Sequence, residues 1–68
     1  MKDPLSNLGQ NIRTFRMKKG LSQEALAQVL KVDKAYVSRV EGGKKNLTMK
    51  SLAKIAGALS IDIKKLFL

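Results

Sequence analysis

The side chains best suited to chemistry lie on one short predicted helix, residues 33–41. Its outward face is small, polar and cationic, and it carries Lys34, Ala35, Ser38 and Arg39. Lysine can donate to guanine O6 and N7 in a duplex, and an alanine methyl group can contact the methyl group of thymine. The inward face is dry, with Val37 and Val40 at helical spacing. This pattern predicts a recognition helix that enters a groove of a nucleic acid.

Catalysis and metal binding have little support in the composition. The chain has neither His nor Cys, which removes the usual metal clusters and the Cys–His and Ser–His catalytic pairs. The serines are better explained as helix caps or surface contacts. We therefore expect no enzyme, no catalytic residue, no metal site, no cofactor and no small-molecule ligand.

The recognition helix belongs to a predicted helix-turn-helix over residues 22–42. Ser22 and Asp33 are typical N-caps of two short helices, and Gly42 stops the second. The three residues between these helices are too few for an antiparallel pair, so the helices must cross steeply. Val32 is expected to fill the turn. The apolar face of the first of these helices is predicted to comprise Leu26, Val29 and Leu30.

The remaining chain predicts helices on either side of this unit. A first helix covers about residues 4–19, a fourth about 48–59, and a short C-terminal helix about 61–67. The expected apolar stripe of the fourth helix is Met49, Leu52, Ile55, Ala56 and Leu59. Because 68 residues support one small core, we expect a single all-α domain over residues 1–68, a compact five-helix bundle.

The charge balance indicates a polyanionic partner. Fourteen Lys and Arg against five Asp and Glu leave a net charge of +9, which favours nucleic acid. The alternative is that lysine serves only solubility, but the positive charge is concentrated in residues 31–54, around the recognition helix. The sequence has neither an apolar run of membrane-spanning length nor a secretory leader. We therefore expect a cytoplasmic protein without membrane contact.

The chain resembles the phage repressor and Cro (Xre-type) helix-turn-helix family over about residues 8–67. The matching residues are Gln23-Glu24, Ala27, Val32, Val37, Val40 and Glu41-Gly42-Gly43-Lys44. The run 46–52 is similar to the controller proteins of restriction–modification systems, a subgroup of that family. The resemblance implies a lambda-repressor-like fold. Lys31 departs from the pattern, which usually has glycine there; if this residue needs a positive φ, lysine costs about 1 kcal/mol.

The same resemblance implies how the chain would divide its contacts with DNA. Base contacts would come from the outward face of the recognition helix, and backbone contacts from Gln23, Tyr36, Lys44, Lys45, Asn46 and Lys50. An alternative for Tyr36 is that its ring packs against the helix and its hydroxyl group makes no DNA contact. Arg39 could contact either a base or the DNA backbone. The start of the fourth helix also favours a phosphate on physical grounds, because backbone N–H groups and nearby cations meet there.

Two charged residues fall on faces that should be buried. Arg16 lies at the edge of the apolar stripe of the first helix, and Glu41 lies beside Val37 and Val40. A buried charge needs a partner, so we expect Arg16 and Glu41 to form a structural ion pair, as matching positions do in the resembled family. The alternative is two independently solvated side chains.

The C-terminal segment has more apolar residues than barely two turns of helix need. They are Ile61, Ile63, Leu66, Phe67 and Leu68. Some can close the core, and the remainder would form a surface patch that needs a partner. Since the resembled family dimerises through this region, we expect a homodimer; the alternative is a monomer in which all five residues cover the core.

Together these observations predict a sequence-specific transcriptional regulator that binds a pseudo-palindromic site on double-stranded DNA as a homodimer. The alternative is a protein-interaction module that has kept the helix-turn-helix, such as an antitoxin or bridging factor, because fold alone does not define function.

Overall fold

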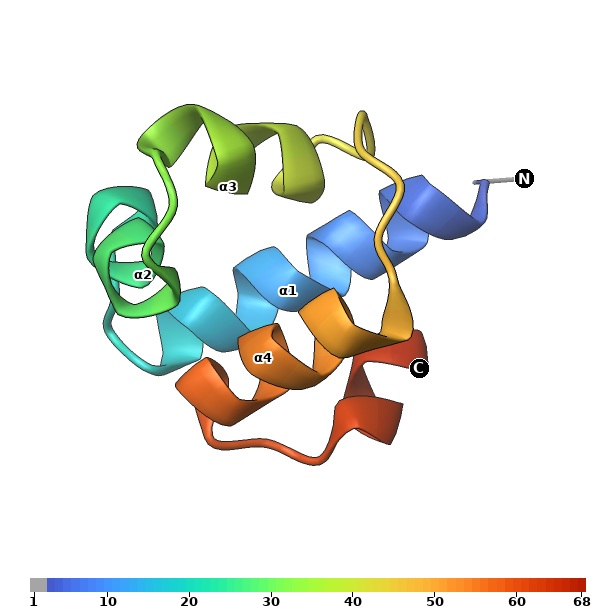
Figure 1. Cartoon of the computed structure of the whole chain (residues 1–68). Helices are drawn as coiled ribbons and strands as arrows, with labels where there is room; N and C mark the ends of the chain where they lie inside the picture. Colours follow the sequence, from blue (N-terminus) through green and yellow to red (C-terminus); the bar gives the residue numbers. More distant parts are fainter. Residues whose placement is uncertain (1–2) are drawn as a thin grey trace.

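The computed structural model describes residues 3–68 as a small all-helical bundle (Figure 1). Its elements are α1 (Pro4–Lys18), α2 (Gln23–Leu30), α3 (Lys34–Glu41), α4 (Met49–Leu59) and the 3₁₀ helix η1 (Ile63–Phe67). The described part contains no strand. Residues 1 and 2 of the expected domain lie outside the described residues. The described residues form four α-helices and not a bundle of five, because the short C-terminal helix expected over about residues 61–67 is the 3₁₀ helix η1.

Each α-helix begins at a residue whose side chain caps it. Asp3, Ser22, Asp33 and Thr48 have extended backbones, and their side-chain oxygens accept from a backbone N–H three residues ahead. The donor–acceptor distances are between 2.8 and 3.1 Å. Such caps satisfy N–H groups that have no partner inside the helix. The helix starts are therefore fixed by local sequence.

The core lies around α1, which contacts α3, α4 and η1 (Figure 1). Buried apolar side chains from all four α-helices and η1 form this core, and the largest fully buried ones are Ile12, Leu26, Val37 and Leu66. Leu66, predicted as an interface residue, is 0% exposed. The apolar side chain of Leu66 closes the core, which removes it from any direct contact with a second copy.

Two apolar side chains predicted on inner faces are exposed. Val29 is 56% exposed and Met49 is 64% exposed. Leu26 and Ala27 are the buried residues of α2, and Val29 points away from the face they define because each helical residue turns by about 100°. Met49 is the first residue of α4 and extends beyond the core.

The turn between α2 and α3 uses the left-handed backbone conformation. Lys31, the C-cap of α2, has φ 60° and ψ 44°. The condition stated in the sequence analysis, that this residue needs a positive φ, is therefore met. The N–H of Val32 donates to the carbonyl of Ala27 at 3.0 Å, which closes the helix end. A lysine in this conformation costs about 1 kcal/mol relative to glycine.

No helix within residues 3–68 combines the length and the apolar character needed to cross a membrane.

Candidate nucleic-acid interface

α3 has one buried and one open face, and Figure 1 shows it at the upper edge of the bundle. Val37 and Val40 are 1% and 4% exposed. The open face carries the four residues predicted to contact bases, all of them exposed: Lys34, Ala35, Ser38 and Arg39. The structure therefore brings these four side chains together on one accessible surface.

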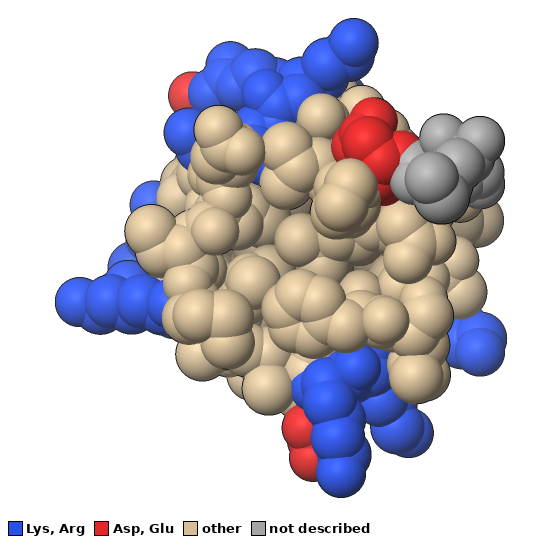
Figure 2. All heavy atoms as spheres, turned by 90° about the vertical axis from the view of Figure 1, so that its right-hand side faces the viewer, with Lys and Arg blue, Asp and Glu red and all other residues tan. Residues whose placement is uncertain are grey.

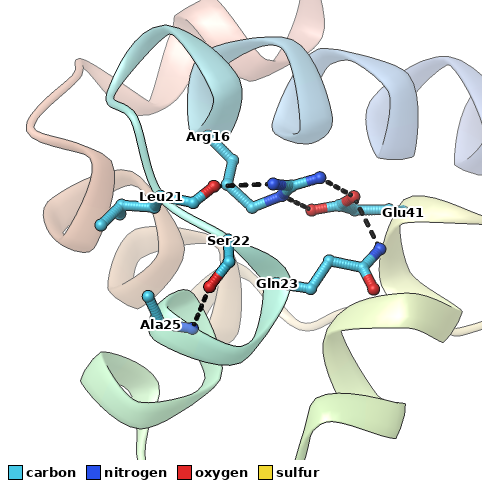
Figure 3. A network of polar contacts seen from close by, with 6 residues as sticks. All are labelled: Arg16, Leu21, Ser22, Gln23, Ala25 and Glu41. Carbon is cyan, nitrogen blue, oxygen red and sulfur yellow. Dashed lines mark hydrogen bonds and ion pairs between the residues drawn. The ribbon is translucent and has the colours of Figure 1, made fainter.

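A buried ion pair fixes α3 against α1 (Figure 3). Arg16 Nε lies 2.6 Å from Glu41 Oε2, and a second guanidinium nitrogen donates to Glu41 Oε1 at 3.1 Å. The third nitrogen donates to the Leu21 carbonyl at 2.7 Å. The side chains are only 11% and 4% exposed. This bidentate arrangement satisfies both charges and restricts the orientation of α3.

Gln23 extends the network to α2, a contact that sequence reasoning missed. Its side-chain Nε2 donates to Glu41 Oε1 at 3.1 Å (Figure 3). An amide nitrogen carries two hydrogens, so this bond leaves a second hydrogen for another acceptor. The sequence predicted that Gln23 lies at the start of a helix, directly after the cap Ser22. It contained no signal that the Gln23 side chain would contact Glu41.

The loop after α3 lies beside the recognition helix and is rich in cations. Lys44 and Asn46 of this loop are exposed, as is Lys50 at the start of α4, whereas Lys45 is half-buried. The Lys45 ammonium lies 5.4 Å from the centroid of the Tyr36 ring, which is within the range of a cation–π contact. Tyr36 is half-buried and packs against the core. The Tyr36 ring therefore packs against the protein, which was one of the two alternatives for this residue. A contact between its hydroxyl group and DNA stays a prediction.

The start of α4 offers backbone N–H groups near these cations. Thr48 caps the helix by accepting from the N–H of Ser51 at 3.1 Å, and Lys50 lies in the first turn. The positive end of a helix dipole favours an anion. The loop and the helix start thus form one cationic edge next to the open face of α3.

Figure 2 shows one group of Lys and Arg side chains at the level of α3, others at the sides and the bottom of the same face, and a broad area without Lys, Arg, Asp or Glu across its centre. The exposed apolar side chains of the C-terminal segment are Phe67, at 54%, and Leu68, at 78%. Ile61 and Ile63 are half-buried. Of the five residues predicted for a dimer interface, four therefore keep accessible surface.

The C-terminal segment is tied to α1 by two asparagines that sequence reasoning did not select. Asn11 Nδ2 donates to the carbonyls of Leu66 and Leu68, both at 2.9 Å, and Asn7 Nδ2 donates to Leu68 at 3.2 Å. Their spacing of four residues, which puts both amides on one helix face, was the available signal.

Residues 3–68 contain no group of three or more His, Cys, Asp or Glu side chains placed to hold a metal ion.

Comparison with known proteins gives consistent matches. A helix-turn-helix family model matches residues 12–66. The control protein C.MunI of a Mycoplasma species is 35% identical over 98% of this chain and 92% of its own length. A hypothetical transcription factor of Neisseria meningitidis is 41% identical over 90% of this chain, which spans only 58% of that relative. The crystal structure of the restriction–modification controller protein C.AhdI from Aeromonas hydrophila superposes with a TM-score of 0.88 at 43% identity, covering 93% of this chain and 91% of that one.

Proposed function

The chain belongs to the Xre-type helix-turn-helix family of transcription regulators, and from this membership we propose that it is a single-domain, lambda-repressor-like regulator that binds a pseudo-palindromic operator as a homodimer. The family is one of DNA-binding regulators and not of enzymes. A regulator of this kind works where the DNA is, in the cytoplasm.

The open face of α3 is the observation that carries the proposal. It offers lysine, serine and arginine donors and an alanine methyl group, the groups that distinguish base edges in the major groove. Its inner face is closed by the core and by the pair between Arg16 and Glu41. The helix can therefore enter a groove without exposing apolar surface.

Backbone contacts would flank this helix on both sides. Gln23 at the start of α2 would bind a phosphate on one side, and Lys44, Lys45, Asn46 and Lys50 would bind the backbone on the other. Such contacts set the register of the protein on the duplex, whereas base contacts set specificity. Tyr36 supports Lys45 through its ring and would contribute its hydroxyl to the same edge.

A homodimer supplies the second half of the operator. Two copies joined through the exposed C-terminal residues would present their α3 helices to successive major grooves, about 34 Å apart, so that two half-sites are related by a two-fold axis. The relatives and neighbours named as controller proteins favour a role in which the protein regulates the genes of a restriction–modification system.

Selection of bound duplexes from a random pool, followed by titration at several salt concentrations, tests the proposal. We expect an enriched pseudo-palindrome, and an affinity that falls steeply with salt because the bound protein displaces counterions. Equal affinity for every duplex would contradict sequence-specific regulation. Absence of duplex binding at low salt would favour a protein-interaction module instead.

A further inference from the structure

A groove between α2 and α4 lies apart from the residues assigned to DNA. It encloses about 410 Å³ and is lined by Val29, Leu30, Lys31, Lys54, Gly57 and Ala58. α2 and α4 contact each other, and the end of α2 meets the end of α4 on one side of the bundle (Figure 1). None of the lining residues belongs to the outward face of α3 or to the cationic edge of the loop.

The floor of this groove is apolar and open. Val29 is 56% exposed although it is a large aliphatic residue, and an added Cβ on Gly57 would meet no atom within 4 Å. A second, smaller hollow of about 120 Å³ shares Leu30 and Lys54 but is also lined by Tyr36, a residue assigned to the DNA backbone, so the proposed site is confined to the larger groove. The larger groove therefore has space for an apolar side chain over Gly57.

The rim of the groove is positively charged. Lys31 and Lys54 are both exposed, and the lining includes no acidic residue. The ion pair formed within residues 3–68 is that of Arg16 with Glu41, so the described chain supplies neither lysine with an acidic partner. Positive charge on both sides of an apolar floor complements acidic residues on both sides of an apolar anchor.

We propose that this groove docks an acidic segment of another polypeptide, whose central apolar side chain contacts Val29 and Gly57 while its carboxylates face Lys31 and Lys54. The apolar floor favours a polypeptide over nucleic acid, because a sugar–phosphate backbone has no large apolar group to bury there. A second copy of this chain is a poor occupant, since its net charge is +9. The proposal stands independently of DNA binding.

Lys31 provides an unusually clean test of the positive rim. Its backbone is left-handed, with φ 60°, a conformation that glycine adopts without strain. Lys31→Gly therefore removes the charge while relaxing the backbone, so that weaker binding cannot be attributed to unfolding. In Gly57→Leu the added side chain occupies the open space above the apolar floor and blocks the groove. Lys54→Gln removes the second positive charge of the rim.

The probe is a synthetic helical peptide with glutamates on both sides of one leucine, titrated into the isotope-labelled full chain and followed by NMR. We expect amide shifts at Leu30, Lys31 and Ala58. Lys31→Gly and Lys54→Gln should each weaken binding about threefold, as exposed ion pairs do, and Gly57→Leu or replacement of the peptide leucine by serine about tenfold. Lys64→Gln, which removes one charge from η1, is the matched control and should leave the affinity unchanged.

A duplex competitor separates this groove from the DNA face. If the shifts fall on α3 and duplex DNA removes them, the peptide is only mimicking phosphate and the proposal is wrong. It is equally wrong if the serine peptide binds as well as the leucine peptide, if Lys64→Gln weakens binding as much as Lys31→Gly, or if no peptide binds. Persistence of the peptide on the chain with duplex present would support a partner that is recruited at the DNA.

Discussion

The guanidinium group of Arg16 donates to both carboxylate oxygens of Glu41, at 2.6 and 3.1 Å, in a site where neither side chain is more than 11% exposed. Arg16→Met should therefore destabilise the chain by about 3–5 kcal/mol, because it leaves the Glu41 charge buried with only the Gln23 amide as a partner. Urea unfolding followed by circular dichroism measures the change.

Arg13→Met is the matched control, since Arg13 is exposed on the same helix and its loss should change stability by less than about 0.5 kcal/mol. A loss below that size for Arg16→Met would show that the pair does not hold α3 in solution.

Replacement by alanine should have opposite effects on stability at two helical glycines, Gly9 and Gly57. A Cβ on Gly9 would lie 2.5 Å from the carbonyl oxygen of Val40 and 2.6 Å from that of Glu41, both backbone atoms that cannot rotate away. Gly9→Ala should destabilise by about 3 kcal/mol, or prevent folding, by forcing α1 away from α3. Gly57→Ala meets no atom within 4 Å and should stabilise by up to about 1 kcal/mol through helix propensity. Equal unfolding midpoints for the two variants would contradict the packing of α1 against α3.

The two proposed kinds of DNA contact differ in their response to sequence. Lys34→Ala should cost about 1–3 kcal/mol on the best operator and relax the preference at one base pair. Lys45→Ala should weaken every duplex alike and lower the salt dependence. Binding of both variants to a panel of single-base operator changes makes the comparison. If the two variants respond identically across the panel, the division between bases and backbone is wrong.

The exposed end of the C-terminal segment is expected to hold the dimer together. Phe67→Ser and Leu68→Ser should each shift the sedimentation profile toward monomer at a fixed concentration. Both side chains are more than half exposed, so folding should be little affected. Val29→Ser is the control, because Val29 is similarly exposed but lies on α2. A wild-type protein that stays monomeric at every concentration, or a Val29→Ser variant that dissociates equally, would rule out this interface.

The cap of α1 gives stability a specific dependence on pH. The Ser6 backbone N–H donates to the Asp3 carboxylate at 2.9 Å, and the Ser6 hydroxyl donates at 3.2 Å; these bonds hold the pKa of Asp3 below its usual value of 3.8. Since the folded-state pKa is the lower one, the carboxylate stabilises the fold above the usual pKa, and this stabilisation is lost as the pH falls through the lowered pKa.

Asp3→Asn tests this effect, because asparagine caps a helix without titrating. Unfolding free energies measured from neutral to strongly acidic pH should fall less steeply for the variant than for the wild type in that window. Superimposable profiles would mean that the carboxylate of Asp3 does not cap α1 in solution.

The elements that could be predicted from sequence are those determined by local chemistry. Asp3, Ser22, Asp33 and Thr48 each mark a helix start because a cap needs only residues three positions apart. The outward face of α3 was equally readable from helical spacing. The ion pair between Arg16 and Glu41 could be predicted because a charged side chain on an apolar helix face needs an oppositely charged partner.

Contacts that join distant parts of the chain were harder to predict. The bond from Gln23 to Glu41 and the stacking of Lys45 on Tyr36 depend on how α3 is oriented, which no local pattern encodes. The exposure of Val29 was missed because only Leu26 and Ala27 of the eight-residue helix α2 are buried, a narrower face than helical periodicity suggests. The C-terminal segment was counted as a fifth helix of the bundle, but it forms only a 3₁₀ helix of five residues.

Glu41 Oε1 accepts hydrogen bonds from both Arg16 and Gln23, so the same atom connects the buried ion pair with a residue proposed to bind the operator. One side chain of α2, proposed to meet the DNA backbone, rests on the same oxygen that receives a guanidinium nitrogen from α1. Protein variants that disturb this junction would therefore lose affinity for every duplex before they lose their helical content. A screen for regulators whose binding is weakened equally on every duplex should accordingly recover substitutions of the buried residues Arg16 and Glu41, which are not proposed to touch DNA.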